Sequence, residues 1–279
     1  MKGTVEIIDC KIKYKIKVVG SGNVINHYCN VKFVALFSAK KKKKNLEYSV
    51  TPNDFISIDV DIFKNIVIYG KQKSVHNEFR FEFSAIIEQD DEYYEKGDVG
   101  EGVSPSLFLY PHNSTVFSND VKELSEKIKG EYDPSLSMID KIRYYANYIF
   151  ENFQYESNLT DTRTDVSQFL KLGRGVCQDF SNLLIVLLRI EDIPARYVSG
   201  FLEGIGETHA WVEFYDGEKW LGVDPTHNLL IDNGYIKIGH GLDSSNCIVN
   251  SGFFKSKEKD EMIFQTLEIN VMVEKTERN

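Results

Sequence analysis

Cys177 stands at the end of the stretch GRGVC, directly before the apolar run QDFSNLLIVLLRI, which has the composition of a helix buried on most sides. A thiol at a helix start lies beside free backbone amides and the positive end of the helix dipole, which lower its pKa toward the thiolate. Two strand-like segments downstream carry His209 and Asp224. A thiol, an imidazole and a carboxylate in one site can attack amide or ester carbonyls, so these three residues form a candidate catalytic triad.

The positions of His209 and Asp224 also follow from strand geometry. Between them, Asp216-Gly217 predicts a two-residue hairpin turn. In the register of that turn, His209 and Asp224 are direct cross-strand neighbours on one face of the sheet, with Cβ atoms about 5 Å apart. The opposite face then carries a consistent apolar set, which consists of Ala210, Val212, Phe214, Leu221 and Val223. A carboxylate beside an imidazole would fix its tautomer and stabilise the imidazolium.

An oxyanion that forms on a substrate carbonyl needs hydrogen-bond donors. The backbone N–H of Cys177 is one candidate donor, and Tyr155 and Gln178 are the candidates for the second. Asp179 would oppose a thiolate if its carboxylate faced the sulfur. We expect it instead to cap the helix or to pair with Arg174.

The predicted secondary structure that must position these residues changes along the chain, from strands to helices. The first part has the period of half-buried strands, most clearly in KIKYKIKVV and in EFRFEFSAII, whose three phenylalanines share one face. CNVKFVALF and ISIDVDIF are further strand candidates. The acidic, glycine-containing stretch 89–105 predicts a linker or a long loop.

Helical spacing begins after this stretch. It predicts one helix around Val121–Ile128 and a second over Leu136–Ile149, which the Asp-Pro-Ser sequence at 133–135 would open. Alternation at 267–273 indicates a final strand. We place a boundary near residue 116, between an N-terminal β-rich domain over residues 1–115 and a catalytic domain over residues 116–279.

The segment from about Phe153 to Asn228 resembles the transglutaminase-like superfamily, and within it a bacterial branch whose members are labelled cysteine proteases. The resemblance rests on FQYESNLTDTRT, GRGVCQDFSNLLIVLLRIEDIPARYVSGFL and HAWVEFYDGEKWLGVDPTHN, and more loosely on YIKIGHGLDSSN. It implies that Cys177 is the nucleophile, His209 the general base and Asp224 the orienting acid. The upstream segment DIFKNIVIYGKQKSVHNEF also resembles the N-terminal domain of that branch.

The resemblance implies an α+β fold, in which an N-terminal β domain precedes a papain-like core with a central helix packed on an antiparallel sheet. Two features depart from the pattern of the branch. Asn182 stands where the branch often has His, and GHGLDSSN replaces its usual GRDYxD. These departures bear on the substrate or acceptor side, whereas all three triad positions are intact.

We expect a cysteine-dependent hydrolase, a protease or amidase, that acts on a peptide or protein amide through a thioester acyl-enzyme. This chemistry requires no metal and no other cofactor. Hydrolysis is favoured over transfer because a transferase needs a dry second channel for an amine. The segment from Ser199 to Gly206 is short and glycine-rich, and we expect an open, flexible loop there that builds no such channel.

Three alternatives stay open. The first is transglutaminase-type transfer of the acyl group to an amine, because both reactions share the acylation step. The second is a non-catalytic protein-binding module on the same fold. The third is a zinc site built from Cys177, His209, Asp224 and His227, which are suitable ligand types, although their spacings match no compact zinc motif.

The composition limits the partners. A net charge of −9 argues against broad binding of nucleic acid, and the run Lys40–Lys44 is best explained as a solvated loop. No apolar run approaches the ~18 residues of a membrane span, and no apolar signal region is expected at the N-terminus. The four cysteines, Cys10, Cys29, Cys177 and Cys247, have no paired spacing, which favours free thiols in a cytoplasmic protein. No feature sets the oligomeric state.

Overall fold

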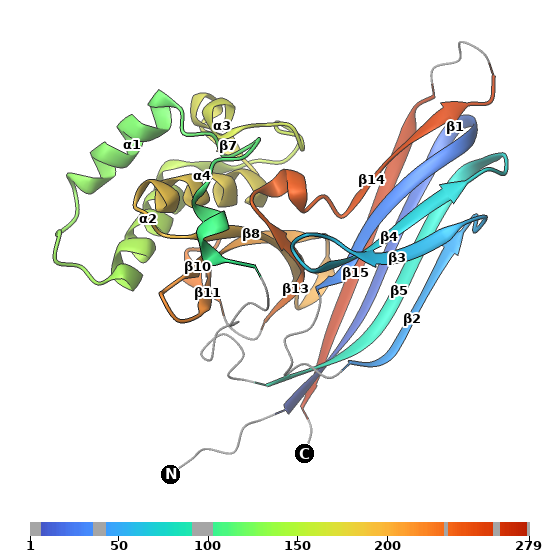
Figure 1. The fold of residues 1–279 in the computed structure, drawn as a ribbon, viewed down its shortest axis with the longest axis horizontal. Helices are drawn as coiled ribbons and strands as arrows, with labels where there is room; N and C mark the ends of the chain where they lie inside the picture. The colour runs from blue at the N-terminus through green and yellow to red at the C-terminus, as the bar shows by residue number, and fades with distance from the viewer. Residues whose placement is uncertain (1–6, 36–42, 91–102, 232–233, 259–262, 278–279) are drawn as a thin grey trace.

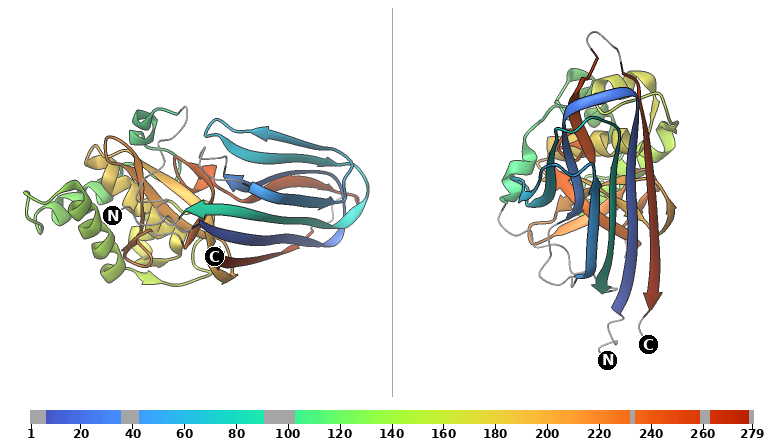
Figure 2. Two further views of the ribbon diagram at one scale, coloured as in Figure 1. Left: turned by 90° about the horizontal axis from the view of Figure 1, so that it is seen from below. Right: turned by 90° about the vertical axis from the view of Figure 1, so that its right-hand side faces the viewer.

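The computed structural model describes residues 7–35, 43–90, 103–231, 234–258 and 263–277 of the chain (Figure 1). Helices and a smaller sheet gather at one end of the molecule, and long strands of a larger sheet extend beside them (Figures 1 and 2). The predicted loop at 40–44 and the predicted linker at 89–105 lie largely outside the described residues. No helix in the described part of the chain is both long and apolar enough to cross a membrane.

The larger sheet takes up most of the N-terminal part, as the alternating pattern predicts. Within the described residues it has eight antiparallel strands: β1 (Ile7–Ala35), β2 (Lys43–Thr51), β3 (Ile56–Val60), β4 (Asn65–Gln72), β5 (His76–Asp90), β9 (Gly204–Gly206), β14 (Asn250–Ser256) and β15 (Gln265–Glu277). Their order is β2-β5-β1-β15-β9. β4 and β14 pair with the second half of β1, and β3 pairs with β4.

The smaller sheet is also antiparallel and has the order β12-β11-β10-β8-β13. Its strands are β8 (Ala195–Leu202), β10 (His209–Tyr215), β11 (Trp220–Asp224), β12 (Leu229–Leu230) and β13 (Tyr235–Gly241). A short parallel pair joins β6 (Gln154–Tyr155) to β7 (Arg174–Gly175). The helices are α1 (Asn119–Lys129), α2 (Met138–Asn152), α3 (Val166–Leu172) and α4 (Cys177–Ile190), with 3₁₀ turns at Pro105–Leu109 and Ser244–Asn246.

Helix α4 is the centre of the core beside the smaller sheet. It packs against β8 and β10, and eleven of its fourteen residues are buried because its apolar side chains surround the helix on nearly all sides. The predicted apolar face of β10 and β11 belongs to the same core cluster, with Ala210, Val212, Phe214 and Val223 buried. The expected α+β architecture, with a β-rich N-terminal part and a central helix on an antiparallel sheet, is therefore confirmed.

The two sheets share a hydrophobic core. Phe79, Phe81 and Phe83 of β5 are buried on one face, as predicted, and join a cluster that includes Phe201 of β8. The rings of Tyr14 and Phe201 lie 5.2 Å apart between their centroids. The larger sheet thus supports the strand β8, which lies next to the strand that carries His209.

The chain returns to the larger sheet after the core. β14 and β15 lie within the segment 116–279 that the sequence assigned to the catalytic domain, yet both pair with β1. The segment from Ser199 to Gly206 is also not the open loop that we expected. Most of it is the end of β8 and the whole of β9, and β9 pairs with β15 through Gly206 and Val271.

One helix start also differs from the prediction. α2 begins at Met138, where the hydroxyl of Ser137 accepts a hydrogen bond of 3.2 Å from the backbone of Asp140. The earlier Asp133 forms a separate turn, because its carboxylate accepts the backbone N–H of Ser135 at 2.9 Å. Three short polar residues, Asp133, Ser135 and Ser137, lie before this helix, and the last of them caps it.

Candidate active site

Cys177 is the first residue of α4, as the sequence predicts. The buried carboxylate of Asp179 caps this helix start, since it accepts the backbone N–H of Val176 at 2.8 Å and the hydroxyl of Thr160 at 2.7 Å. A Cβ at Gly175 would collide with this carboxylate, which explains the glycine. Burial raises the pKa of Asp179, and its hydrogen bonds oppose that shift.

Of the two roles expected for Asp179, a helix cap or an ion pair with Arg174, the structure therefore shows the helix cap. Arg174 pairs instead with Glu156, at 3.0 Å between the guanidinium and the carboxylate. The preceding Gly173 ends α3 with a φ of 68°, a left-handed conformation that favours glycine. The chain can therefore turn directly from α3 through β7 into α4.

His209 and Asp224 contact each other, although the predicted register is wrong. The strands pair Tyr215 with Trp220 and Val212 with Val223, so His209 lies diagonally from Asp224 instead of directly opposite. The turn has four residues because the Asp216 carboxylate accepts two backbone N–H groups and its own N–H reaches Lys219. Since the register shifts by two residues, both side chains keep their predicted face.

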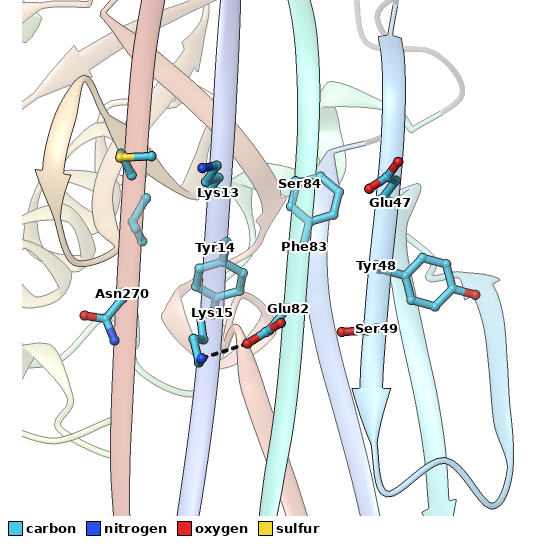
Figure 3. Close-up of a pocket in the computed structure, with 12 residues that line it drawn as sticks. Lys13, Tyr14, Lys15, Glu47, Tyr48, Ser49, Glu82, Phe83, Ser84 and Asn270 are labelled. Carbon is cyan, nitrogen blue, oxygen red and sulfur yellow. Dashed lines mark ion pairs between the residues drawn. The ribbon is translucent and has the colours of Figure 1, made fainter.

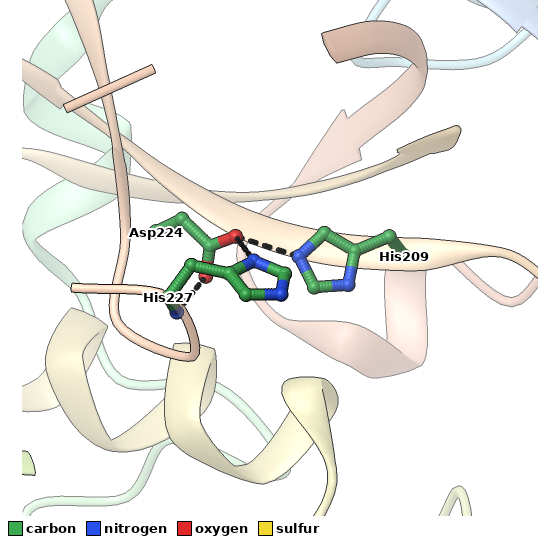
Figure 4. A group of neighbouring side chains, drawn as sticks. All are labelled: His209, Asp224 and His227. Atoms are coloured by element: carbon green, nitrogen blue, oxygen red, sulfur yellow. Dashed lines mark hydrogen bonds and ion pairs between the residues drawn. The ribbon is translucent and has the colours of Figure 1, made fainter. Parts of the chain in front are cut away.

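Asp224 is fully buried and accepts hydrogen bonds at both oxygens (Figure 4). Its Oδ2 accepts from His209 Nε2, from His227 Nδ1 and from the hydroxyl of Tyr235, each at 2.7 Å. Its Oδ1 accepts the backbone N–H groups of Thr226 and His227 at 2.7 and 3.3 Å. Burial raises the pKa of this carboxyl, but these bonds outweigh it and hold the pKa well below its usual range.

The ring of His209 joins Asp224 to Cys177. Burial lowers the pKa of His209, but hydrogen bonds to Asp224 and to the Cys177 side chain, together with their charges, raise it to about 9. Because Nε2 of His209 is hydrogen-bonded to Asp224, the other ring nitrogen, Nδ1, makes the contact with the Cys177 thiol. This arrangement stabilises the imidazolium form of His209 next to the side chain of Cys177.

The two candidate oxyanion donors differ in position. Tyr155 lies on β6, beside Gly175 of β7, and its hydroxyl hydrogen-bonds the backbone of Cys177. Partial burial raises the pKa of Tyr155, and the electrostatic effect of the neighbouring Cys177 side chain adds to this shift. The side-chain amide of Gln178 instead donates to the carbonyl of Asp161 at 2.9 Å, so it does not face the thiol. The geometry favours Tyr155 over Gln178.

A cleft of about 570 Å³ opens beside the His209 ring. Its lining residues come from four parts of the chain: Tyr155, Leu202, Glu203, Gly206, Glu207, Thr208, His209, Thr226, His227 and Val271. The pair of β9 and β15 supplies one wall, which ties the larger sheet to the site. A further hollow of about 510 Å³ on the larger sheet, around Tyr14, Tyr48 and Phe83 (Figure 3), is lined by no cysteine or histidine.

Sequence reasoning did not assign His227 and Tyr235 to the carboxylate of Asp224. His227 has a local signal, since it follows Asp224 by three residues across a proline turn. Tyr235 has none, because it reaches the site from β13, across β8 and β10. Asn182 and the segment GHGLDSSN, the two features that depart from the family pattern, contact each other. The side chain of Asn182 and Ser244 of that segment are joined by hydrogen bonds of 2.9 and 3.2 Å in the core, and neither residue lines the cleft.

Comparisons with known proteins bear on this site. Residues 122–225 match the model of the transglutaminase-like superfamily. An uncharacterized protein of Mycobacterium tuberculosis is 32% identical over 152 residues, 49% of this chain and 48% of that protein. The protein-glutamine gamma-glutamyltransferase of Pseudomonas aeruginosa is 33% identical over 110 residues, 34% of this chain and 16% of that protein. The chain thus spans at most about half the length of these curated relatives.

A solved structure agrees over nearly the whole chain. The crystal structure described as "a Putative Cysteine Protease from Cytophaga hutchinsonii" superposes with a TM-score of 0.74, and the match covers 99% of this chain and 92% of that one. Its sequence identity of 21% makes this a likeness of fold. Residues 122–225, the region that matches the model of the transglutaminase-like superfamily, include Cys177, His209 and Asp224.

Proposed function

We propose that this chain is a cysteine-dependent hydrolase, a protease or amidase, that cleaves amide bonds through a thioester on Cys177. The observation that carries the proposal is the hydrogen-bonded series of Cys177, His209 and buried Asp224 at the start of α4. Such a series supplies a nucleophile, a base and a group that orients the base. The fold shared with the Cytophaga hutchinsonii structure is consistent with it.

The acylation step follows from the geometry. The Cys177 thiolate adds to the carbonyl carbon of the amide, and the carbonyl oxygen becomes an anion. The backbone N–H of Cys177 and the hydroxyl of Tyr155, which already lie together, would donate to that oxygen. When the tetrahedral intermediate collapses, the C–N bond breaks and Nδ1 of His209 gives its proton to the leaving amine. The product of this step is a thioester on Cys177.

Deacylation uses the same groups. Nδ1 of His209, now without its proton, accepts a proton from water, and the oxygen of that water adds to the thioester carbonyl. Collapse releases a carboxylic acid and restores the thiolate beside the imidazolium. Asp224 keeps the Nε2–H of His209 in place through both steps. Every proton transfer passes through His209, and this sequence of steps calls for no cofactor.

The open cleft supports water as the acceptor. Tyr155 is 58% exposed, and the side chain of His227 on the same cleft is 46% exposed. Transfer to an amine requires that water be kept from the acyl-enzyme. The similarity to the Pseudomonas aeruginosa glutamyltransferase keeps amine transfer as the second candidate, because both reactions share the acylation step.

The proposed substrate is a peptide or protein amide, and the four free cysteines are consistent with a proposed cytoplasmic location.

The test is mass spectrometry of the intact protein after incubation with a panel of amide and ester substrates. We expect an acyl group on Cys177 that is absent from the Cys177→Ala variant. If no member of a broad panel labels Cys177, a non-catalytic binding module on this fold becomes the better explanation.

A further inference from the structure

Three ligand atoms converge at a point that the proposed hydrolysis does not fully use. His209 Nε2 and His227 Nδ1 each lie 2.7 Å from Asp224 Oδ2, and all three atoms lie within 4.8 Å of one another (Figure 4). The hydroxyl of Tyr235 is a fourth neighbour, also 2.7 Å from Oδ2. His227 has no part in acylation or deacylation, yet its imidazole is aimed at the same carboxylate oxygen as that of His209.

The donor types indicate a class of metal. Two imidazole nitrogens and one carboxylate oxygen suit Zn²⁺ and related transition-metal ions, whereas Ca²⁺ and Mg²⁺ prefer oxygen ligands alone. Around a tetrahedral zinc with bonds near 2.0 Å, ligand atoms lie roughly 3.3 Å apart. To reach this spacing, each His–Asp distance of 2.7 Å must lengthen by about 0.6 Å, and the two imidazole nitrogens, which lie within 4.8 Å of each other, must adjust to the same spacing. His227 lines the open cleft, so an ion and its remaining water ligand can reach the site from solvent.

We propose that His209, Asp224 and His227 form a reversible, inhibitory binding site for Zn²⁺ or a similar transition-metal ion. Cys177 is not a ligand, because it contacts the opposite nitrogen of the His209 ring from the one that faces Asp224. This site therefore differs from the thiol-containing zinc site that the sequence suggested as an alternative. The binding does not depend on the proposed function, whereas the inhibition rests on it.

Inhibition follows from the two nitrogens of His209. A metal on Nε2 takes the lone pair there, so the proton of the neutral ring must sit on Nδ1. Nδ1 can then no longer accept a proton from the Cys177 thiol or from water. The same ion occupies the oxygen of Asp224 that otherwise orients His209. Binding of one ion would thus remove both the base and the group that orients it.

The test titrates Zn²⁺ into the whole protein by calorimetry, with the wild type and three variants, each checked for folding by its thermal transition. We expect one Zn²⁺ per chain in the wild type and in Cys177→Ala, and at least about tenfold weaker binding in His227→Asn, which lacks the third ligand. His76→Asn is the matched control. It removes a histidine from the pair His27–His76, whose nitrogens lie 3.1 Å apart away from the cleft, and we expect it to bind like the wild type.

Two further measurements complete the test. The Co²⁺ form should show no sulfur-to-metal charge-transfer band, because the thiol is not a ligand. Where turnover is measurable, Zn²⁺ should inhibit the wild type and the His76→Asn variant, with recovery in EDTA, and should inhibit His227→Asn far less. Loss of binding in Cys177→Ala, loss in His76→Asn, unchanged binding in His227→Asn, or no binding by the wild type would each overturn the proposal. The calorimetry stands even if no amide substrate is turned over.

Discussion

Asp224 Oδ2 accepts the Nε2–H of His209 at 2.7 Å inside a fully buried environment, and the ring of His209 contacts Cys177 through its other nitrogen. The orientation of the base therefore depends on one carboxylate whose side chain is fully buried in the metal-free protein. The same carboxylate also accepts from His227 and Tyr235, so turning it away would break these two bonds as well. Because the Asp224 carboxylate is held in place by these bonds, substitution of Asp224 tests the proposed mechanism directly.

We expect Asp224→Asn to lower kcat by on the order of 10⁴, by analogy with serine triads, because an amide leaves His209 in the wrong tautomer. Cys177→Ala should abolish turnover, since it removes the nucleophile and little packing. Steady-state kinetics on an amide that acylates the wild type measure both effects, and thermal unfolding shows that each variant is folded. Near-wild-type turnover in either folded variant contradicts the mechanism.

Tyr155 and Gln178 allow a matched test of the oxyanion donor. Tyr155→Phe removes the hydroxyl that lies at the Cys177 backbone, and we expect kcat to fall by about 10²–10³. Gln178→Ala should change kcat little, because the Gln178 amide is bound to the carbonyl of Asp161. The two variants are compared on one substrate, with KM and kcat determined separately. Equal effects would show that Tyr155 has no particular role in the transition state.

The local parts of this site could be predicted from the sequence, because they depend on short-range patterns. The helix after Cys177 and the common face of His209 and Asp224 follow from apolar periodicity. The face was predicted correctly even though the turn was not, since an error of two residues keeps the side-chain direction. The sequence did not reveal that the Asp216 side chain would organise a four-residue turn.

The long-range parts could not be predicted. Tyr235 reaches Asp224 because β13 pairs with the far side of β8, and no local pattern encodes that order. The pairing of β9 with β15 has the same origin, and it turned an expected loop into a wall of the cleft. Glu213 is another case: it is fully buried on β10, and Arg196 of the adjacent β8 and Lys237 of β13, two strands away, each donate to it at 2.6 Å.

Alkylation should distinguish Cys177 from the other three thiols. Cys177 is partly exposed and bound to His209, whereas Cys10, Cys29 and Cys247 are buried. Burial raises the pKa of Cys29, and it raises that of Cys247 to about 12, which suppresses both thiolates at neutral pH. We expect iodoacetamide to label Cys177 first in the native protein, as measured by peptide mapping over time. Faster labelling at any buried cysteine would contradict an activated thiol at Cys177.

The pKa of His209 predicts how stability depends on pH. The pKa of His209 is about 9 in the folded chain against an ordinary value of 6.5, so the folded state holds this proton more tightly. The resulting stabilisation, on the order of 3 kcal/mol, is fully present below about pH 6.5 and is lost as the pH rises through about 9. Denaturant unfolding of the wild type and His209→Gln measures it. Their difference in unfolding free energy should shrink across that window, and a constant difference would contradict the raised pKa.

The last prediction separates hydrolysis from amine transfer. Both reactions acylate Cys177, so the difference lies in what reaches the thioester. Tyr155 and His227 border an open cleft, and water should therefore outcompete primary amines. Incubation with a glutamine-bearing protein and a fluorescent amine should release ammonia without incorporating the label, and Cys177→Ala should release none. Efficient incorporation that is lost in Cys177→Ala would instead identify a transferase. The wall formed by β9 and β15 would then be the part of this fold that shields the acyl-enzyme from water.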